Sequence, residues 1–190
     1  MTPHDPILSW LVAALTSWTS PPMDASVAQA RAEVAGEIAE VAYDPFEPPV
    51  YGGTQARAKT AVLLGVIATL ETRLAGHVRA GHCRPHECDH GAAVGLMQIH
   101  VGPDGIRLTE LGYRRCGHRD ASCLHESDIL RDERTAIRLA LHMIRQSGLA
   151  SYCGEAPEGP VTERRRSEVK AWLAKSPVPV ADGPYMADSD

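Results

Sequence analysis

Aromatic residues are scarce in this sequence, and long apolar runs are absent from it. Phe, Trp and Tyr make up 5% of the 190 residues, and only one residue is Phe. The apolar residues are mostly Ala, Val, Leu and Ile. Because Ala and Leu favour helices whereas strands favour aromatic side chains, the composition predicts a mainly α fold. No apolar run reaches the roughly 20 residues that cross a bilayer, so no transmembrane segment is expected.

Lysine and arginine are too few for a typical nucleic-acid-binding protein, and none precedes the first apolar run, as a secretory signal would require. The formal net charge is −5. A dedicated nucleic-acid binder needs a basic surface that displaces counterions from phosphates, so no nucleic-acid partner is expected. The apolar run at residues 7–15 could resemble a secretory signal, but the first basic residue of the chain is Arg31. A signal needs a basic region before its apolar run, so we predict an amphipathic helix there and no signal peptide.

Proline and glycine divide the chain into helical segments. We expect residues 1–50 to form an N-terminal helical extension that packs on a catalytic domain of residues 51–175, followed by a flexible tail at 176–190. A mobile N-terminal arm is the alternative. In the catalytic domain we expect three helices: one from Thr54 to a stop at Gly76, one capped by Ser127 and ended by Ser147-Gly148, and one from Glu163 to Lys175. A short helical turn is expected at residues 108–111.

Glu71 ends a strongly apolar stretch, residues 61–70, of the expected central helix. Burial in apolar surroundings disfavours a carboxylate and raises its pKa, which is what a general acid requires near neutral pH. The alternative is an ordinary surface glutamate that pairs with Arg73 or Arg79.

A compact segment, Gly95-Leu96-Met97-Gln98-Ile99, follows after a loop rich in His and Cys. Glycine lets backbone approach closely, the three apolar side chains would pack, and Gln98 offers a donor and an acceptor that suit sugar hydroxyl and acetamido groups. The chain resembles the soluble lytic transglycosylase family of the lysozyme-like superfamily in the order of four features. These are a helix that ends in Glu, this segment, a long helix and then a Tyr-x-Gly segment. The family pattern is Glu-Ser, Gly-Leu-Met-Gln-Ile and Ala-Tyr-Asn-x-Gly, and the first and last of these read Glu71-Thr72 and Ser151-Tyr152-Cys153-Gly154 here.

The resemblance covers about residues 54–155. It implies a lysozyme-like helical domain with an irregular, loop-rich lobe, and cleavage of the β-1,4 bond between N-acetylmuramic acid and N-acetylglucosamine in peptidoglycan. Glu71 would be the general acid and then the base, Gln98 would line the glycan cleft, and Tyr152 would orient Glu71 or the substrate. The same motifs place Met97, Thr72 and Gly95 in the substrate-binding region. Thr72 keeps the hydroxyl of the usual Ser, whereas Cys153 lacks the amide of the usual Asn.

The resemblance leaves the reaction product open. The family uses one Glu, and the 6-hydroxyl of the sugar closes a 1,6-anhydro ring, whereas water in the same role gives a muramidase. A two-carboxylate hydrolase needs a second carboxyl group about 5–9.5 Å from the acid. Glu87, Asp89 and Asp104 flank the Gly95–Ile99 segment and are candidates, although each is also typical of an ordinary loop or turn.

Four of the five cysteines form two close pairs. Disulfides Cys83–Cys88 and Cys116–Cys123 are expected, although four cysteines allow three connectivities, and such bonds imply an oxidising destination. Free thiols are one alternative. Another is a structural zinc ion held by Cys83, His86, Cys88 and His90, with no metal needed for catalysis. Cys153 with His142 could form a nucleophile pair, but no local signature of a cysteine peptidase accompanies it.

Peptidoglycan glycan strands are therefore the expected partner, and the bacterial cell wall is the expected site of action, from the periplasm or a virion. A phage or mobile-element setting is expected by analogy. One rival is a catalytically inactive, lysozyme-like assembly protein of a virion or secretion apparatus. Another is a zinc-dependent peptidase or binding module. The run Arg164-Arg165-Arg166 is expected to be solvated rather than to bind an anion.

Overall fold

Helices dominate the protein, as its composition predicts. The computed structural model describes residues 6–17, 25–53, 55–84, 88–109, 112–117, 122–152 and 159–177. The long helices are α1 (Pro6–Ser17), α2 (Ala25–Tyr43), α3 (Ala56–Thr72), α7 (Glu133–Tyr152) and α8 (Pro160–Lys175), and the short ones are α4 (Gly76–Arg79), α5 (Cys88–Gly91) and α6 (Glu126–Arg131). The prediction of a mainly α fold is confirmed. Within the described ranges, we find no helix with the length and apolar character needed to span a membrane.

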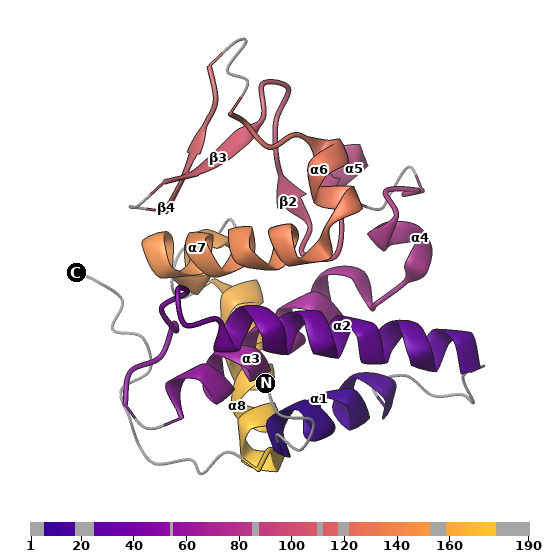
Figure 1. The fold of residues 1–190 in the computed structure, drawn as a ribbon, viewed down its shortest axis with the longest axis vertical. Coiled ribbons are helices and arrows are strands. Elements are labelled where there is room, and N and C mark those ends of the chain that lie inside the picture. Colours follow the sequence, from indigo (N-terminus) through magenta and orange to yellow (C-terminus); the bar gives the residue numbers. More distant parts are fainter. Residues whose placement is uncertain are drawn as a thin grey trace.

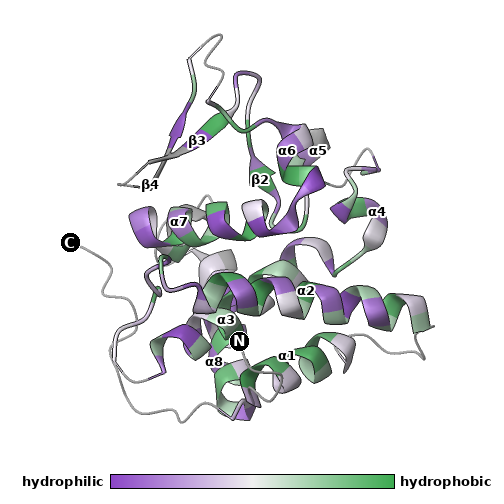
Figure 2. Cartoon of the chain, in the orientation of Figure 1, coloured by the Kyte–Doolittle hydropathy of each residue, from purple (hydrophilic) through white to green (hydrophobic). Residues whose placement is uncertain are grey.

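Helix α3 forms the centre of the helical part. Its residues from Thr60 to Thr69 are buried on every face, which follows from a sequence with almost no polar side chain in that stretch. Helices α1, α2, α7 and α8 contact it, and Figure 1 shows α2 between α1 and α7. Figure 2 shows apolar residues on each of these helices, and the buried ones among them form one cluster. Trp10 of α1 packs edge-to-face on Trp172 of α8 at 5.8 Å, so the first and last of the described helices share this core.

A smaller, loop-rich lobe lies beyond α7 (Figure 1). It contains two antiparallel hairpins, β1 (Ala93–Val94) with β2 (Ile99–His100), and β3 (Ile106–Thr109) with β4 (Gly112–Arg115). Leu108 and Thr109 belong to β3, so the helical turn predicted at 108–111 is wrong at these two positions, and residues 110–111 lie outside the described part of the chain. Ile106 exchanges backbone hydrogen bonds with Leu124 at 2.9 and 2.7 Å, so a distant segment fixes this stretch as a strand.

The ends of two helices differ from their predicted positions. Helix α3 ends at Thr72, because Arg73 and Leu74 adopt left-handed φ values of 50° and 56°. The N–H of Arg73 still donates to the carbonyl oxygen of Thr69, at 2.9 Å, and Gly76 begins α4 instead of ending α3. At the other end, Thr54 lies outside the described residues, and Gln55 is the N-cap.

The helix predicted from Ser127 onward is two helices. His125 is the N-cap of α6, and its N–H donates to the Asp128 carboxylate at 2.9 Å in a capping box. Asp132 is extended and separates α6 from α7. Gly148 interrupts α7 with a φ of 76°, close to the predicted stop, and α8 begins at Pro160, before the predicted Glu163.

The proline-rich connector between α2 and α3, residues 44–50, is held by half-buried charged side chains. Arg57 donates through Nη1 to the carbonyl oxygens of Ala42, Asp44 and Glu47 at 3.1, 2.6 and 3.0 Å. The Glu47 carboxylate lies 2.9 Å from Nε2 of His142 on α7. His142 is therefore part of a structural hydrogen-bonded cluster around Glu47, and its proposed partner Cys153 lies outside the described residues.

Replacing Arg57 with Met should lower the free energy of unfolding by about 2 kcal/mol, because three connector carbonyls would lose a charged donor. Urea unfolding followed by circular dichroism measures the change. Lys59→Met, two positions along the same helix, is the matched control. An equal loss in both variants would mean that the Arg57 hydrogen bonds add nothing specific.

Candidate functional site

A cavity of about 330 Å³ lies between the helical part and the small lobe. Four separate segments contribute to it: the end of α3, the α5 region, the β1–β2 hairpin and α8. Its lining consists of Glu71, Cys88, Asp89, Ala93, Gln98, His100 and Arg165. The fold thus brings Glu71 and Gln98, the two main residues predicted from sequence, to one cavity.

Glu71 is mostly buried at the C-terminal end of α3. Its side chain is 15% exposed, and Oε1 lies 2.5 Å from Nη2 of Arg165, whose side chain is 10% exposed. Burial raises the pKa of the Glu71 carboxyl group above its ordinary value, while the charges of Arg165 and Arg164 oppose the rise. The predicted alternative of surface pairing is not what we observe, since Arg79 forms a bidentate pair with Glu133 at 2.7 Å.

Gln98 lies in the tight turn that joins β1 to β2. Its backbone N–H and its side-chain Nε2 both donate to the carbonyl oxygen of Gly95, at 3.1 and 2.9 Å, which fixes the carboxamide beside the cavity. Leu96 and Met97 are fully buried and anchor the turn in the core. Gly95 has a φ of 68°, and a Cβ there would lie 3.3 Å from Ile129, so glycine fits both the backbone and the space.

Three residues predicted to bind substrate support the cavity instead of lining it. The Thr72 hydroxyl is buried, donates to the carbonyl oxygen of Ala68 at 2.9 Å and accepts from the N–H of Leu74 at 3.1 Å. It therefore stabilises the end of α3 directly beside Glu71. Met97 and Gly95 are buried in the same turn as Gln98 and are not among the residues that line the cavity. The backbone of Tyr152 belongs to α7, but its side chain lies outside the described residues.

Asp89 and His100 lie close together at the cavity. Oδ2 of Asp89 lies 3.5 Å from Nε2 of His100, and their side chains are 64% and 51% exposed. Asp104, another carboxylate candidate, is exposed in the turn after β2 and is not one of the residues that line this cavity. Glu87, the third candidate, lies outside the described residues. Of the candidate carboxylates that the structure describes, Asp89 is thus the one that lines the cavity with Glu71.

Strained backbone surrounds the same cavity. Six non-glycine residues in the described part of the chain have positive φ values, and five of them line the cavity or directly follow Glu71-Thr72: Arg73, Leu74, Cys88, Asp89 and Gln98. Left-handed backbone costs free energy in residues with a Cβ and is found preferentially at functional sites. The sequence gives little signal for this strain, because Asp89 alone among the five belongs to a residue type that adopts left-handed backbone readily.

Both predicted disulfides are present, Cys83–Cys88 and Cys116–Cys123. The first holds the strained residue Cys88 at the edge of the cavity. Because the sulfur atoms of Cys83 and Cys88 are bonded to each other, they are not thiolate ligands of the zinc site considered from sequence. His86 and the side chain of His90 lie outside the described residues, and among the described side chains no group of three His, Cys, Asp or Glu could hold a metal ion.

Removing the first disulfide in the double variant Cys83→Ser/Cys88→Ser should lower the free energy of unfolding by about 2 kcal/mol, since it closes a short loop. It should also loosen Asp89, which hydrogen exchange of the 88–94 amides would detect. The control is Cys116→Ser/Cys123→Ser, a similar loop away from this cavity, where those amides should stay protected. Unchanged exchange in the first variant would contradict a role for the disulfide in the site.

Arg165 was missed by the sequence prediction. The run Arg164-Arg165-Arg166 was expected to be solvated, but Arg165 is 8% exposed, because it lies on the buried face of α8 with Thr162 and Val169. These spacings of three and four residues are the signal that could have identified it.

No protein-family model, curated protein or solved structure matches this chain, so its geometry alone supports a function.

Proposed function

We propose that this protein cleaves peptidoglycan glycan strands at the β-1,4 bond between N-acetylmuramic acid and N-acetylglucosamine, with Glu71 as the general acid. The observation that carries the proposal is the position of Glu71: a buried carboxyl group of raised pKa that still lines an open cavity beside Gln98. Breaking a glycosidic bond needs a proton on the leaving oxygen, and a raised pKa keeps that proton available.

Arg165 and Gln98 have complementary roles in this proposal. When Glu71 gives its proton to the bridging oxygen, it becomes a buried carboxylate, and the guanidinium of Arg165 at 2.5 Å stabilises that charge. Gln98 is fixed by its bond to Gly95 and presents a carboxamide to the cavity, where it would hydrogen-bond a hydroxyl or acetamido group of the sugar. The cavity between a helical part and a loop-rich lobe is also what a lysozyme-like fold would provide.

The disulfides support the proposed place of action. Two such bonds persist in oxidising surroundings, and peptidoglycan lies outside the reducing cytoplasm. The protein would therefore act in the periplasm or from a virion, in keeping with a phage or mobile-element setting.

One observation favours the alternative of an inactive, lysozyme-like assembly protein. The ion pair between Glu71 and Arg165 joins α3 to α8, and it would stabilise this packing in the absence of any substrate. In that case Glu71 would be a structural residue, and the cavity would not bind glycan.

Digestion of purified peptidoglycan distinguishes the two. Wild-type protein should release soluble muropeptides that mass spectrometry identifies as disaccharide units cut at the muramic acid C1 atom, and Glu71→Gln should not. A well-folded wild-type protein that releases no muropeptides would overturn the proposal and favour the assembly protein.

A further inference from the structure

The cavity holds a second carboxylate whose surroundings contrast with those of Glu71. We infer that Asp89 is the base that activates water in this site, so that cleavage is hydrolytic and leaves a reducing muramic acid end. The inference rests on the proposed function and goes beyond it by naming the attacking molecule and the product.

The two carboxyl groups face opposite conditions in one cavity. The Glu71 side chain is 15% exposed and shielded by Arg165, whereas the Asp89 side chain is 64% exposed. A buried carboxyl group suits proton donation, while a hydrated carboxylate can hold and deprotonate a water molecule. The same division of roles between two carboxyl groups defines a two-carboxylate glycosidase.

The backbone conformation, a disulfide and His100 define the surroundings of Asp89. Cys88 and Asp89 both have left-handed backbone, with φ values of 53° and 48°, and the Cys83–Cys88 disulfide holds this turn. His100 lies on β2 directly opposite Ala93, another residue of the cavity wall, and its Nε2 is 3.5 Å from Asp89 Oδ2. His100 thus lies beside the Asp89 carboxylate at the cavity.

The proposed step is balanced without any further reactant. Glu71 donates its proton to the bridging oxygen as the bond from that oxygen to C1 breaks. A water molecule attacks C1, and Asp89 takes the proton that the water loses. Solvent then carries this proton from Asp89 and returns one to Glu71. One water is consumed for each bond, and attack from the face opposite the leaving group gives the α anomer first.

The form of the product tests the inference separately from the proposed function. Hydrolysis gives muropeptides that borohydride reduces, whereas ring closure gives 1,6-anhydro products that are lighter by one water and not reducible. We expect reducible products from the wild-type protein, with the α anomer seen first by nuclear magnetic resonance. Anhydro products that depend on Glu71 would overturn the role of Asp89 and leave the proposed function standing, whereas no cleavage at all would overturn both.

Substitution of Asp89 supplies the second test. Asn and Gly both tolerate left-handed backbone, so Asp89→Asn and Asp89→Gly should fold normally. We expect each to lower the rate of hydrolysis at least about 100-fold. Asp104→Asn, in the exposed turn outside the cavity, is the matched control and should keep the wild-type rate. Asp89→Asn retaining more than half of the wild-type rate would overturn the inference.

Azide distinguishes a missing base from a damaged fold. Azide needs no deprotonation, so it can attack C1 directly in Asp89→Gly while Glu71 still protonates the leaving oxygen. We expect added sodium azide to restore glycan cleavage and to give an α-glycosyl azide that mass spectrometry detects. A β-glycosyl azide would overturn the inference, because retained configuration in the absence of Asp89 would mean two displacements at C1 through another group, such as the N-acetyl group of the sugar.

Discussion

Replacing Glu71 with Gln should reduce muropeptide release by about 10³-fold while the protein stays folded. An amide has almost the same shape as the carboxyl group but has no acidic proton to give, and general acid catalysis contributes about 10²–10⁴-fold to such reactions. The amide oxygen can still accept a hydrogen bond from Arg165, and the variant buries no negative charge. Its melting temperature at neutral pH should therefore stay the same or rise.

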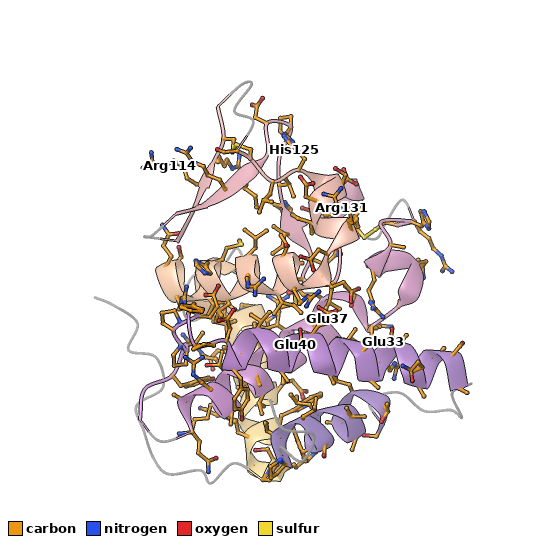
Figure 3. All side chains as sticks on the ribbon, in the orientation of Figure 1. Glu33, Glu37, Glu40, Arg114, His125 and Arg131 are labelled. Atoms are coloured by element: carbon orange, nitrogen blue, oxygen red, sulfur yellow. A yellow bond between two sulfur atoms is a disulfide. The ribbon has the colours of Figure 1, made fainter. Side chains whose placement is uncertain are left out.

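Glu37 provides the matched control for Glu71. It is also a helical glutamate whose pKa is raised mainly by burial, and it pairs with an arginine, Arg134, at 3.1 Å. It lies on α2 with Glu33 and Glu40, on the helix that Figure 3 shows below α7, and it is not one of the residues that line the cavity. Glu37→Gln should keep the rate within about twofold of wild type. A comparable loss of rate in both variants would mean that burial of a glutamate, and not its place in the cavity, explains the effect.

The long helices were predictable because their apolar periodicity reflects the core that they share. The stripe of α1, the apolar middle of α3 and the inward face of α8 all meet in one cluster. The site was predictable in part for the same reason. An acidic residue at the end of an apolar helix is buried by its neighbours, and the Gly95–Ile99 segment needs its glycine for a turn whose next two side chains are buried.

The rest of the site depends on contacts between segments far apart in the sequence. The β3–β4 strands are specified by pairing with each other and with Leu124, and local propensity indicated a helical turn there instead. Arg73 and Leu74 end α3 in left-handed backbone that neither residue favours on its own. The pairing of Asp89 with His100, and of Glu71 with Arg165, likewise requires the three-dimensional fold.

Arg165→Met should destabilise the protein by about 3 kcal/mol at neutral pH. Methionine fills similar space but leaves the buried Glu71 carboxylate without its cation, and breaking one side of a buried ion pair typically costs 3–5 kcal/mol. Arg165 also makes contacts besides this pair, so the size of the loss alone does not assign it to Glu71.

The pH dependence of the lost stability shows whether the loss comes from the pair with Glu71. Arg165 is the first of the charges that lower the Glu71 pKa, so its removal should raise this pKa further above the ordinary value of 4.5. A carboxyl group with a raised pKa holds its proton more tightly in the folded state than in the unfolded state. It therefore destabilises the fold progressively as pH rises from the unfolded-state pKa, near 4.5, to the folded-state pKa, and no longer does so below the unfolded-state value. The deficit of Arg165→Met should accordingly be largest at neutral pH and shrink as the solution is acidified.

A double variant completes the cycle. Glu71→Gln/Arg165→Met has no buried charge to leave unpaired, so it should recover most of the stability lost in Arg165→Met and show little of its pH dependence. Urea unfolding of the four proteins between pH 4 and pH 8 gives the coupling free energy at each pH. A deficit that stays constant with pH, and that the double variant does not recover, would show that Arg165 stabilises α8 through its other contacts. The pKa of Glu71 would then not depend on Arg165. The carboxylate that remains after proton donation would need a different stabilising partner.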